Sequence, residues 1–241
     1  PLPFDSRTNP GALLPSIPGR VGVTASNVYN PFGEDLTDVR RRVSETGGRL
    51  FEQEVNQIQL NTGLRGTFGE LAPTWEWDVS WQWGRRARID TDVGQFSGAR
   101  LAQALGPSFF DAEGNAVCGT PGAPISGCVP LNLFGGAGTI TQDQLDFVTV
   151  ALNDRRTTKR QVFNASLQGD LFELPAGTVA TAFGYEFRKE EFSFVPDSGK
   201  ATDAVTGSTA GPTDGEYDVD SLFAEIAIPL LSQVPGAELL E

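Results

Sequence analysis

The 241-residue chain contains no histidine and only two cysteines. Without histidine it cannot build a Ser–His–Asp or Cys–His nucleophile, nor a zinc or haem site with histidine ligands. Two cysteines are too few for a thiolate zinc site or an iron–sulfur cluster. Because the side chains of these sites are missing, we expect no enzymatic activity, no metal and no cofactor.

Basic residues are also scarce, since 18 Lys and Arg stand against 31 Asp and Glu, a net charge of −13. Proteins that bind nucleic acids need a basic surface, so we expect no such partner. No run of about 18 apolar residues occurs, so no helix is expected to span a membrane. The mean hydropathy of −0.20 is typical of a soluble protein. Membrane β-barrels escape that rule, because half of each strand is polar.

Methionine is absent as well, and the chain begins at Pro1 without a signal-peptide pattern. Residues 237–241, Ala-Glu-Leu-Leu-Glu, look like the opening of a strand. Both ends together predict a fragment of a longer protein.

A period of two is the clearest pattern that is present. In Trp75-Glu76-Trp77-Asp78-Val79-Ser80-Trp81-Gln82-Trp83 every odd position is apolar and every even position polar. This alternation is typical of a β-strand with one apolar and one polar face. All four tryptophans fall on the apolar face. We expect the carboxylates of Glu76 and Asp78 to lie on opposite sides, which would exclude an acid/base pair.

The same alternation recurs in four further segments, 58–68, 163–171, 179–187 and 222–230. Segments of about nine to eleven residues match tilted strands that cross a bilayer. Short turns rich in proline and glycine occur at 69–73, 174–177 and 232–236. Long connections alternate with these turns, as in outer-membrane barrels. The sequence predicts strands at 50–69, 75–90, 160–173, 178–194 and 217–231.

The predicted fold is all-β: an antiparallel transmembrane β-barrel segment, with long extracellular loops that contain short helices. The whole of 1–241 is expected to be a fragment of one barrel domain. Its parts are an extracellular loop and hairpin (1–50), a strand pair (50–90), a long loop with both cysteines (91–159), a strand pair (160–194), a loop (195–216), and a strand, turn and start of the next strand (217–241).

A soluble β-sandwich is the main alternative, because its strands alternate too. Four tryptophans on one strand face are difficult to bury in a core about 10 Å thick, and a loop of about 70 residues is unusual in a sandwich. A lipid face with an aromatic girdle accommodates both features. Its expected residues are Trp75, Trp77, Trp81, Trp83, Phe183, Tyr185 and Phe187.

Several motifs in order resemble proteobacterial TonB-dependent outer-membrane receptors. They are Asn30-Pro31-Phe32-Gly33, Arg40-Arg41-Arg42 with Gly47-Gly48-Arg49, Gly63-Leu64-Arg65-Gly66-Thr67-Phe68-Gly69, Trp75-Glu76-Trp77-Asp78, Cys128-Val129-Pro130-Leu131-Asn132-Leu133-Phe134-Gly135, Gly184-Tyr185-Glu186-Phe187-Arg188, and Asp218-Val219-Asp220-Ser221-Leu222-Phe223-Ala224-Glu225. The resemblance covers the middle of the barrel.

This resemblance implies about five to six strands of a 22-stranded barrel. It also implies an N-terminal plug, which this chain does not contain, and uptake energised by a TonB complex through that plug. The implied place is the outer membrane of a Gram-negative bacterium, with its lipid as a partner. The implied cargo is a scarce nutrient such as a siderophore, cobalamin or oligosaccharide. A secreted carbohydrate-binding β-sandwich and a passive porin-like channel remain alternatives.

The long loop carries most of the remaining candidates. Cys118 and Cys128 are expected to form a disulfide at an oxidising cell surface. Short helices are expected at 97–105 and from Thr141, where Gln144 has capping-box spacing and Leu145, Val148 and Leu152 form one stripe. Asp111–Asn115 is expected to be a solvated turn rather than a calcium loop, and 196–220 a mobile polar loop.

Aromatic and basic side chains are the candidate contacts for ligands and lipid. Low-ranking candidates for ligand contact are Phe96, Phe109, Phe110, Phe134, Arg86 and Arg88, although aromatic residues in loops more often anchor the loop itself. Arg85, Lys159 and Lys189 share the lipid-facing register and are expected to contact lipopolysaccharide phosphates. Arg86, Arg88, Arg160 and Arg188 are expected to point inward beside Glu186 and Glu190, where ordinary salt-bridged packing is an equal alternative.

Overall fold

A computed structural model describes residues 21–207, 209–234 and 237–241. Residues 1–20 of the expected first loop and residues 235–236 of the expected last turn lie outside this part. The described residues divide into two units. The loop unit comprises the described parts of 1–54, 89–155 and 195–212, and the sheet unit those of 55–88, 156–194 and 213–241.

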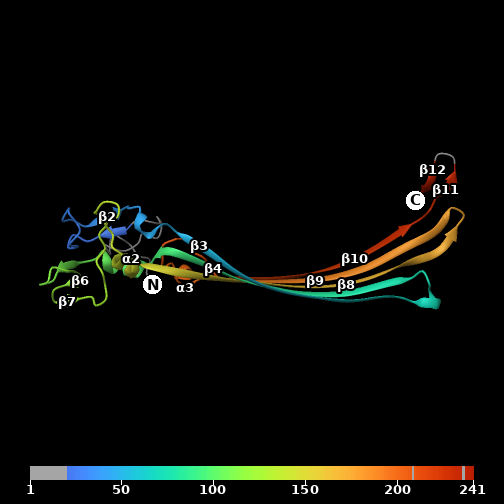
Figure 1. Cartoon of the computed structure of the whole chain (residues 1–241), viewed down its shortest axis with the longest axis horizontal. Coiled ribbons are helices and arrows are strands. Elements are labelled where there is room, and N and C mark those ends of the chain that lie inside the picture. The colour runs from blue at the N-terminus through green and yellow to red at the C-terminus, as the bar shows by residue number, and fades with distance from the viewer. Residues whose placement is uncertain (1–20, 208, 235–236) are drawn as a thin grey trace. The chain divides into compact units, whose positions relative to one another are not determined.

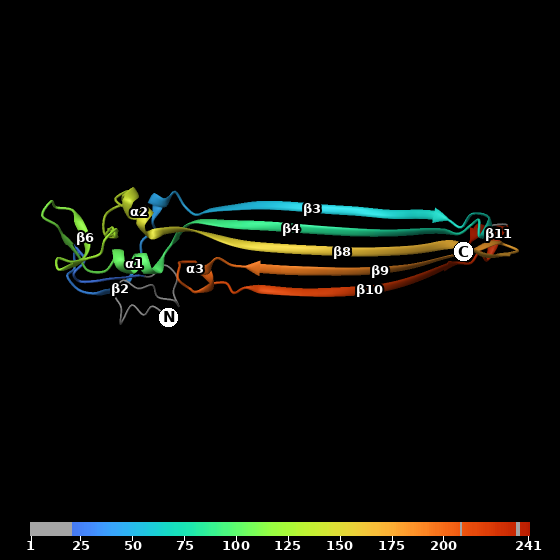
Figure 2. The ribbon, with the colours of Figure 1, turned by 90° about the horizontal axis from the view of Figure 1, so that it is seen from below.

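Five long strands form the principal sheet (Figure 1). They are β3 (Leu50–Thr67), β4 (Glu76–Phe96), β8 (Thr149–Leu174), β9 (Gly177–Val195) and β10 (Thr213–Ala227). Their order is β10-β9-β8-β4-β3, so neighbours in space are neighbours along the chain (Figure 2). The sheet is open, with β3 and β10 at its edges. The all-β, mostly antiparallel fold is confirmed, and closure into a barrel stays a proposal.

Three of these strands have bounds that differ clearly from the prediction. β4 continues to Phe96 instead of residue 90, β8 begins at Thr149 instead of 160, and β10 spans Thr213–Ala227 instead of 217–231. The added residues are largely polar on both faces, so they carry no apolar alternation to detect. Pairing of the backbone requires no apolar face, and the strands therefore extend beyond the pattern.

Contacts between neighbouring strands place the apolar positions on one face. An added Cβ at Gly66 of β3 would meet the Trp77 ring, and one at Gly169 of β8 the Trp75 ring. The rings of Phe163 and Tyr185 lie 6.2 Å apart, joining β8 to β9. In the antiparallel β9–β10 pair, Tyr185 is opposite Leu222 and Phe183 opposite Ala224. All five strands therefore contribute their predicted apolar positions to the same face.

Two smaller pieces complete the sheet unit. The 3-10 helix η2 (Gly69–Leu71) occupies the first predicted turn. The short strands β11 (Leu231–Val234) and β12 (Ala237–Leu240) pair antiparallel. The expected opening of a strand at 237–241 is therefore present as β12, which pairs with β11.

The loop unit has its own core. Its buried members come from β1 (Val21–Val23), α1 (Gly98–Ala104), α2 (Gln142–Val148) and the segments between them. They are Val23, Leu101, Ala104, Leu105, Leu131, Ile140, Leu145 and Val148. The other elements are β2 (Leu36–Val39), η1 (Ser44–Thr46), β5 (Ser108–Phe110), β6 (Ala116–Thr120), β7 (Ala123–Pro124) and α3 (Ser198–Ala201). The long loop is thus a folded unit around an apolar cluster.

Both predicted helices of the long loop are present. The Ser97 hydroxyl caps α1 by accepting from the Arg100 N–H, and Thr141 and Gln144 form the capping box of α2. The expected helical stripe is wrong at Leu152, because α2 ends at Val148 and β8 begins at Thr149. Leu152 is nevertheless buried, with 3% of its surface exposed, but it belongs to a strand.

We predict that Gly169→Ala destabilises the sheet by about 1–3 kcal/mol, because its Cβ would lie 2.5 Å from Trp75 Cδ2. Gly215→Ala is the matched control, since Gly215 is also in a strand and nothing lies within 4 Å of an added Cβ. Urea unfolding followed by tryptophan fluorescence measures both. Equal stabilities of the two variants would contradict the packing of Trp75 on Gly169.

Candidate functional site

The apolar face of the sheet unit is open to its surroundings. Leu222 is 84% exposed, Leu64 72% and Ile58 62%. Further large apolar residues in this register are at least 36% exposed, namely Leu60, Trp81, Leu171, Phe183 and Ile226. In a protein surrounded by water such side chains are usually covered, and a contiguous exposed set marks an interaction surface. We call this surface the apolar face.

The predicted aromatic girdle lies on the apolar face, but most of its rings are half-buried against neighbouring strands. Trp81 and Phe183 are exposed, whereas Trp75, Trp77, Trp83, Tyr185 and Phe187 are partly buried. The Trp75 indole Nε1 donates to the carbonyl of Asp170 (3.0 Å). The Tyr185 hydroxyl donates to the carboxylate of Asp220 (2.6 Å). These partners satisfy the polar ends of the two rings.

The opposite face of the sheet unit is mostly polar, although Phe172 and Phe223 are exposed on it. Arginines line two of its hollows. The first is lined by Gln57, Gln59, Gln82, Arg86, Thr158 and Arg160 among others. The second is lined by Arg65, Thr67, Glu76, Asp78, Ser166 and Gln168 among others. The expectation that Glu76 and Asp78 face opposite sides is wrong, because residues two apart on a strand share a face.

Charged residues begin where the apolar face ends. Lys159 Nζ lies 2.8 Å from Glu191 Oε2, and Lys189 Nζ lies 3.0 Å from Glu216 Oε2. Two of the three residues expected to contact lipopolysaccharide are therefore engaged by glutamates. Arg85 is exposed, and it forms no ion pair with any residue in the described part of the chain. Arg85 is the member of this set best placed to meet an external phosphate.

The inward arginines are partly salt-bridged. Arg160 Nε lies 3.7 Å from Glu190 Oε1, a loose ion pair. The guanidinium of Arg156 lies 4.7 Å from the centre of the Phe194 ring, a cation–π contact that the sequence alone did not indicate. Arg86 lines the first hollow, whereas Arg88 is not among its lining residues.

The four phenylalanines proposed for ligand contact do not form one site. Phe96 and Phe134 pack against the core of the loop unit. Phe109 is half-buried on β5, and Phe110 is 58% exposed at the end of that strand. Phe96 and Phe134 therefore anchor the loop itself, as the alternative interpretation expects, whereas Phe110 is accessible to solvent.

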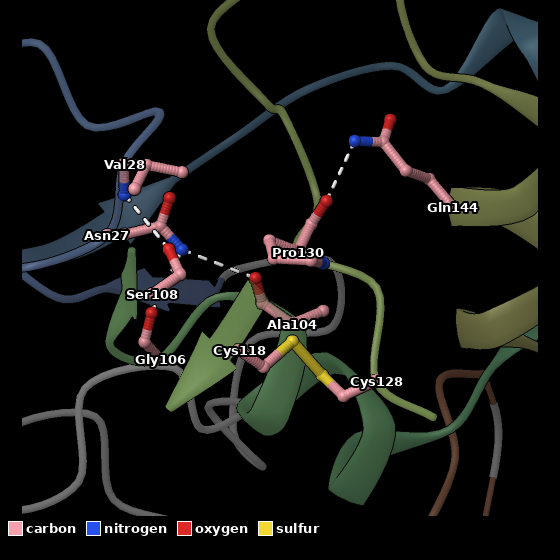
Figure 3. The surroundings of a disulfide bond; sticks show 9 residues. All are labelled: Asn27, Val28, Ala104, Gly106, Ser108, Cys118, Cys128, Pro130 and Gln144. Atoms are coloured by element: carbon pink, nitrogen blue, oxygen red, sulfur yellow. Dashed lines mark hydrogen bonds between the residues drawn. A yellow bond between two sulfur atoms is a disulfide. The ribbon is translucent and has the colours of Figure 1, made fainter. Parts of the chain in front are cut away.

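The expected disulfide joins Cys118 of β6 to Cys128 (Figure 3). Cys118 is fully buried. Just beyond Cys128, the Gln144 side chain donates to the carbonyl of Pro130 (2.7 Å). The disulfide and this hydrogen bond fasten segment 128–130 to β6 and α2. A short cross-link of this kind stabilises by roughly 2.5–3 kcal/mol in the chain-entropy model.

A buried asparagine fastens another segment next to the disulfide. The Asn27 amide donates to the carbonyls of Ala104 (3.2 Å) and Gly106 (2.9 Å), and the Ser108 hydroxyl accepts from the Val28 N–H (Figure 3). Sequence reasoning missed Asn27, because an isolated asparagine in a loop shows no periodicity. These bonds attach segment 27–28 to the end of α1 and to β5.

Two of the motifs that carry the family resemblance are turns of the same kind. In Asn30-Pro31-Phe32-Gly33 and in Asn132-Leu133-Phe134-Gly135 the asparagine Oδ1 accepts from the phenylalanine N–H, at 3.0 Å in each case. The two phenylalanine rings contact each other edge to face, with centroids 5.9 Å apart. The motifs therefore have a structural role, namely joining segments about 100 residues apart.

A second buried link involves Arg41 and Glu45, which lie 2.5 Å apart with side chains only 10% and 7% exposed. The Arg41 guanidinium also donates to the carbonyls of Asn132 (3.0 Å) and Gly136 (2.8 Å). The pKa of Glu45 falls to about 2, first because its own backbone N–H donates to it. The N–H groups of Ile140 and Gly138 and the charge of Arg41 also lower this pKa, whereas burial opposes the shift.

The segment after β9 is held by ion pairs that the sequence did not indicate. Lys200 Nζ binds the carboxylates of Asp92 and Asp154, the latter at 2.8 Å. Asp154 also accepts from the Asp197 N–H (2.9 Å). The expectation of a mobile loop is therefore wrong for residues 197–200, because their polar groups have partners within the loop unit.

Asp111–Asn115 forms the turn between β5 and β6, in agreement with the predicted turn. The Asp111 carboxylate accepts from the N–H groups of Asn115 (2.7 Å) and Glu113 (3.1 Å). These donors, that of Asn115 most strongly, lower the pKa of Asp111. Within the described part of the chain no cluster of histidine, cysteine, aspartate and glutamate is arranged to hold a metal ion.

Comparisons of the chain with protein-family models, with curated proteins and with solved structures find no match. Among the described residues, no helix is both long enough and apolar enough to cross a membrane.

We predict that the link between Glu45 and segment 132–140 weakens as pH falls. The folded-state pKa of Glu45 is depressed from 4.5 to about 2, so its contribution is complete above pH 4.5 and is lost between pH 4.5 and 2. Hydrogen exchange of the Gly138 and Ile140 amides measures the link. In Glu45→Gln we expect faster exchange at pH 7, and the excess rate over wild type should shrink towards pH 2. A constant excess across this range would contradict the role of the Glu45 charge.

Proposed function

We propose that this chain is a lipid-embedded β-barrel segment of a TonB-dependent receptor in the outer membrane of a Gram-negative bacterium. One observation carries the proposal: the sheet unit exposes a contiguous apolar face and has a mostly polar opposite face. In an outer-membrane barrel the apolar face meets lipid and the polar face lines the lumen. The exposed leucines and aromatic rings of the apolar face then contact lipid chains.

The dimensions of the apolar face support this environment. On β3, the stretch from Ile58 to Thr67 has a length of about 30 Å along the strand. At a tilt of about 40° this corresponds to a depth of about 23 Å, close to the ~25 Å apolar band of such barrels. Charged residues in the same register follow Trp83 on β4 and Phe187 on β9, as expected at a membrane boundary.

The β-sandwich alternative requires a second sheet over the apolar face. In the described part of the chain, the other strands are at most five residues long, too short to cover β3 to β10. The proposed sugar platform would need stacked, freely exposed tryptophans, yet Trp75 and Trp77 pack on Gly169 and Gly66. Lipid therefore accounts better for the apolar face.

In this proposal the segment is a scaffold and not an enzyme. The open edges at β3 and β10 pair with further strands of the barrel, since lipid leaves no backbone group unpaired. The loop unit faces the outside and captures a scarce nutrient. A plug domain, acting with the TonB complex, then admits this nutrient to the periplasm. The family resemblance supports the energised mechanism, which separates this proposal from a passive channel.

Membrane insertion is the test of this proposal. We predict that the full-length gene product containing this chain sediments with outer membranes, resists extraction by carbonate, and requires detergent to stay soluble. A matched pair of variants locates the lipid face: Leu222→Asp should reduce membrane assembly severalfold, because lipid offers its charge no solvation, whereas Ser221→Asp should not. A protein that is monomeric without detergent would refute the proposal.

Lipopolysaccharide contact has a separate test. We predict that Arg85→Gln with Lys189→Gln lowers the lipopolysaccharide that co-purifies with the folded protein, because cations that face the phosphates are lost. Arg65→Gln, in the polar-face register, is the control and should leave the amount unchanged. An unchanged lipid content in the double variant would remove these residues from the proposed contact.

A further inference from the structure

The first hollow of the polar face has a one-sided charge. It has a volume of about 320 Å³, within the range of small-molecule pockets. Arg85 and Arg86 of β4 and Arg160 of β8 line it, and no carboxylate of a described residue does so. The carboxylate of Glu190 lies 3.7 Å from Arg160 Nε, a long ion pair. The guanidinium groups of Arg86 and Arg160 therefore keep most of their hydrogen-bonding capacity.

A further arginine lies on the same face of the sheet unit. Arg188 lies two residues before Glu190 on β9 and therefore shares its face. The Nε atom of Arg188 is buried and has no hydrogen-bond partner among the residues that the structure describes. A buried N–H of this kind is costly to leave unpaired. Arg188 thus adds a guanidinium to this face of β9, between Glu186 and Glu190.

The second hollow of the same face is lined by charges of both signs. Its single arginine, Arg65, lines the hollow together with the carboxylates of Glu76 and Asp78. Glu76 in turn accepts from the amide of Gln168 (3.2 Å). The second hollow therefore has carboxylates beside its arginine, whereas the first has arginines and no lining carboxylate.

Neutral hydrogen-bonding groups complete the first hollow. Gln57, Gln59 and Gln82 contribute amides, and Thr158 contributes a hydroxyl. Amides and hydroxyls both donate and accept, which suits the hydroxyl groups of a sugar. The guanidinium group of an arginine binds a carboxylate through two parallel N–H···O hydrogen bonds. The two sets of side chains together match a ligand that carries both groups.

We infer that the first hollow binds an acidic sugar, with Arg86 and Arg160 on the carboxylate and Gln57, Gln59, Gln82 and Thr158 on the hydroxyls. This inference rests on the proposed function for the route of the ligand, since the polar face would line the lumen of the receptor. It names the substrate class as a polyhydroxylated carboxylate.

Calorimetric titration of the full-length gene product in detergent tests the inference, with trigalacturonate and the neutral galactose trisaccharide as probes. We expect trigalacturonate to bind at least about tenfold more tightly than the neutral sugar, as hydrogen bonds to a charged group predict. Arg86→Gln with Arg160→Gln should weaken trigalacturonate binding at least about tenfold and leave the weak neutral binding unchanged. Arg65→Gln is the matched control and should change neither value.

Several results would overturn the inference. They are equal affinity for the two sugars, no binding of either, a loss in Arg65→Gln as large as in the double variant, and displacement of trigalacturonate by equimolar inorganic phosphate. Arg86→Lys guards against misfolding, because it keeps the charge but loses the paired N–H groups, and should bind with intermediate affinity. If Arg86→Lys binds trigalacturonate as weakly as the double variant does, loss of charge is not the cause of the weaker binding, and this outcome contradicts the inference.

The failure of this inference is distinguishable from failure of the proposed function. A protein that assembles in membranes but binds neither probe refutes only the acidic-sugar ligand. A protein that stays soluble without detergent refutes the proposed function, whatever it binds.

Discussion

The register between neighbouring strands is the constraint on which the sheet unit depends. Side chains alternate with a period of two, so slipping one strand by a single residue would move all its apolar side chains to the polar face. Rings lying on glycines oppose such a slip. Trp77 packs on Gly66 and Trp75 on Gly169, and each fit is lost in any other register. The division into an apolar and a polar face follows from these contacts.

The loop unit is held together differently. Its apolar core is small, and polar side chains connect segments that are distant in sequence. Arg41 reaches residues 132 and 136, Asn27 reaches 104 and 106, and Lys200 reaches Asp92. Buried groups of this kind stabilise only when all of their partners are present. The unit is therefore specific in shape, which a surface that captures ligands requires.

The sequence predicts the existence and faces of the five strands, because apolar alternation is a strong local signal. It predicts both helices of the long loop and the capping box of α2 from local spacing, and it predicts the disulfide from two cysteines at an oxidising cell surface. It does not predict the polar extensions of β4 and β8, since pairing of two polar strands has no signature in one sequence. Of the first hollow, Arg86 and the inward direction of Arg160 were predicted. The charge imbalance around them depends on which carboxylates lie nearby, and that requires the fold.

The hydrogen bond from the Ser97 N–H to the carbonyl of Val148, 2.9 Å long, has a consequence for folding kinetics. Residues 97 and 148 are the two ends of the segment between β4 and β8. A flexible chain of that length pays an entropic cost before its ends can meet. Because this segment folds around its own core, its ends are brought together in advance. Strand β8 then reaches β4 almost as easily as β9 reaches β8 through its two-residue turn, and the sheet can grow hairpin by hairpin in the order of synthesis.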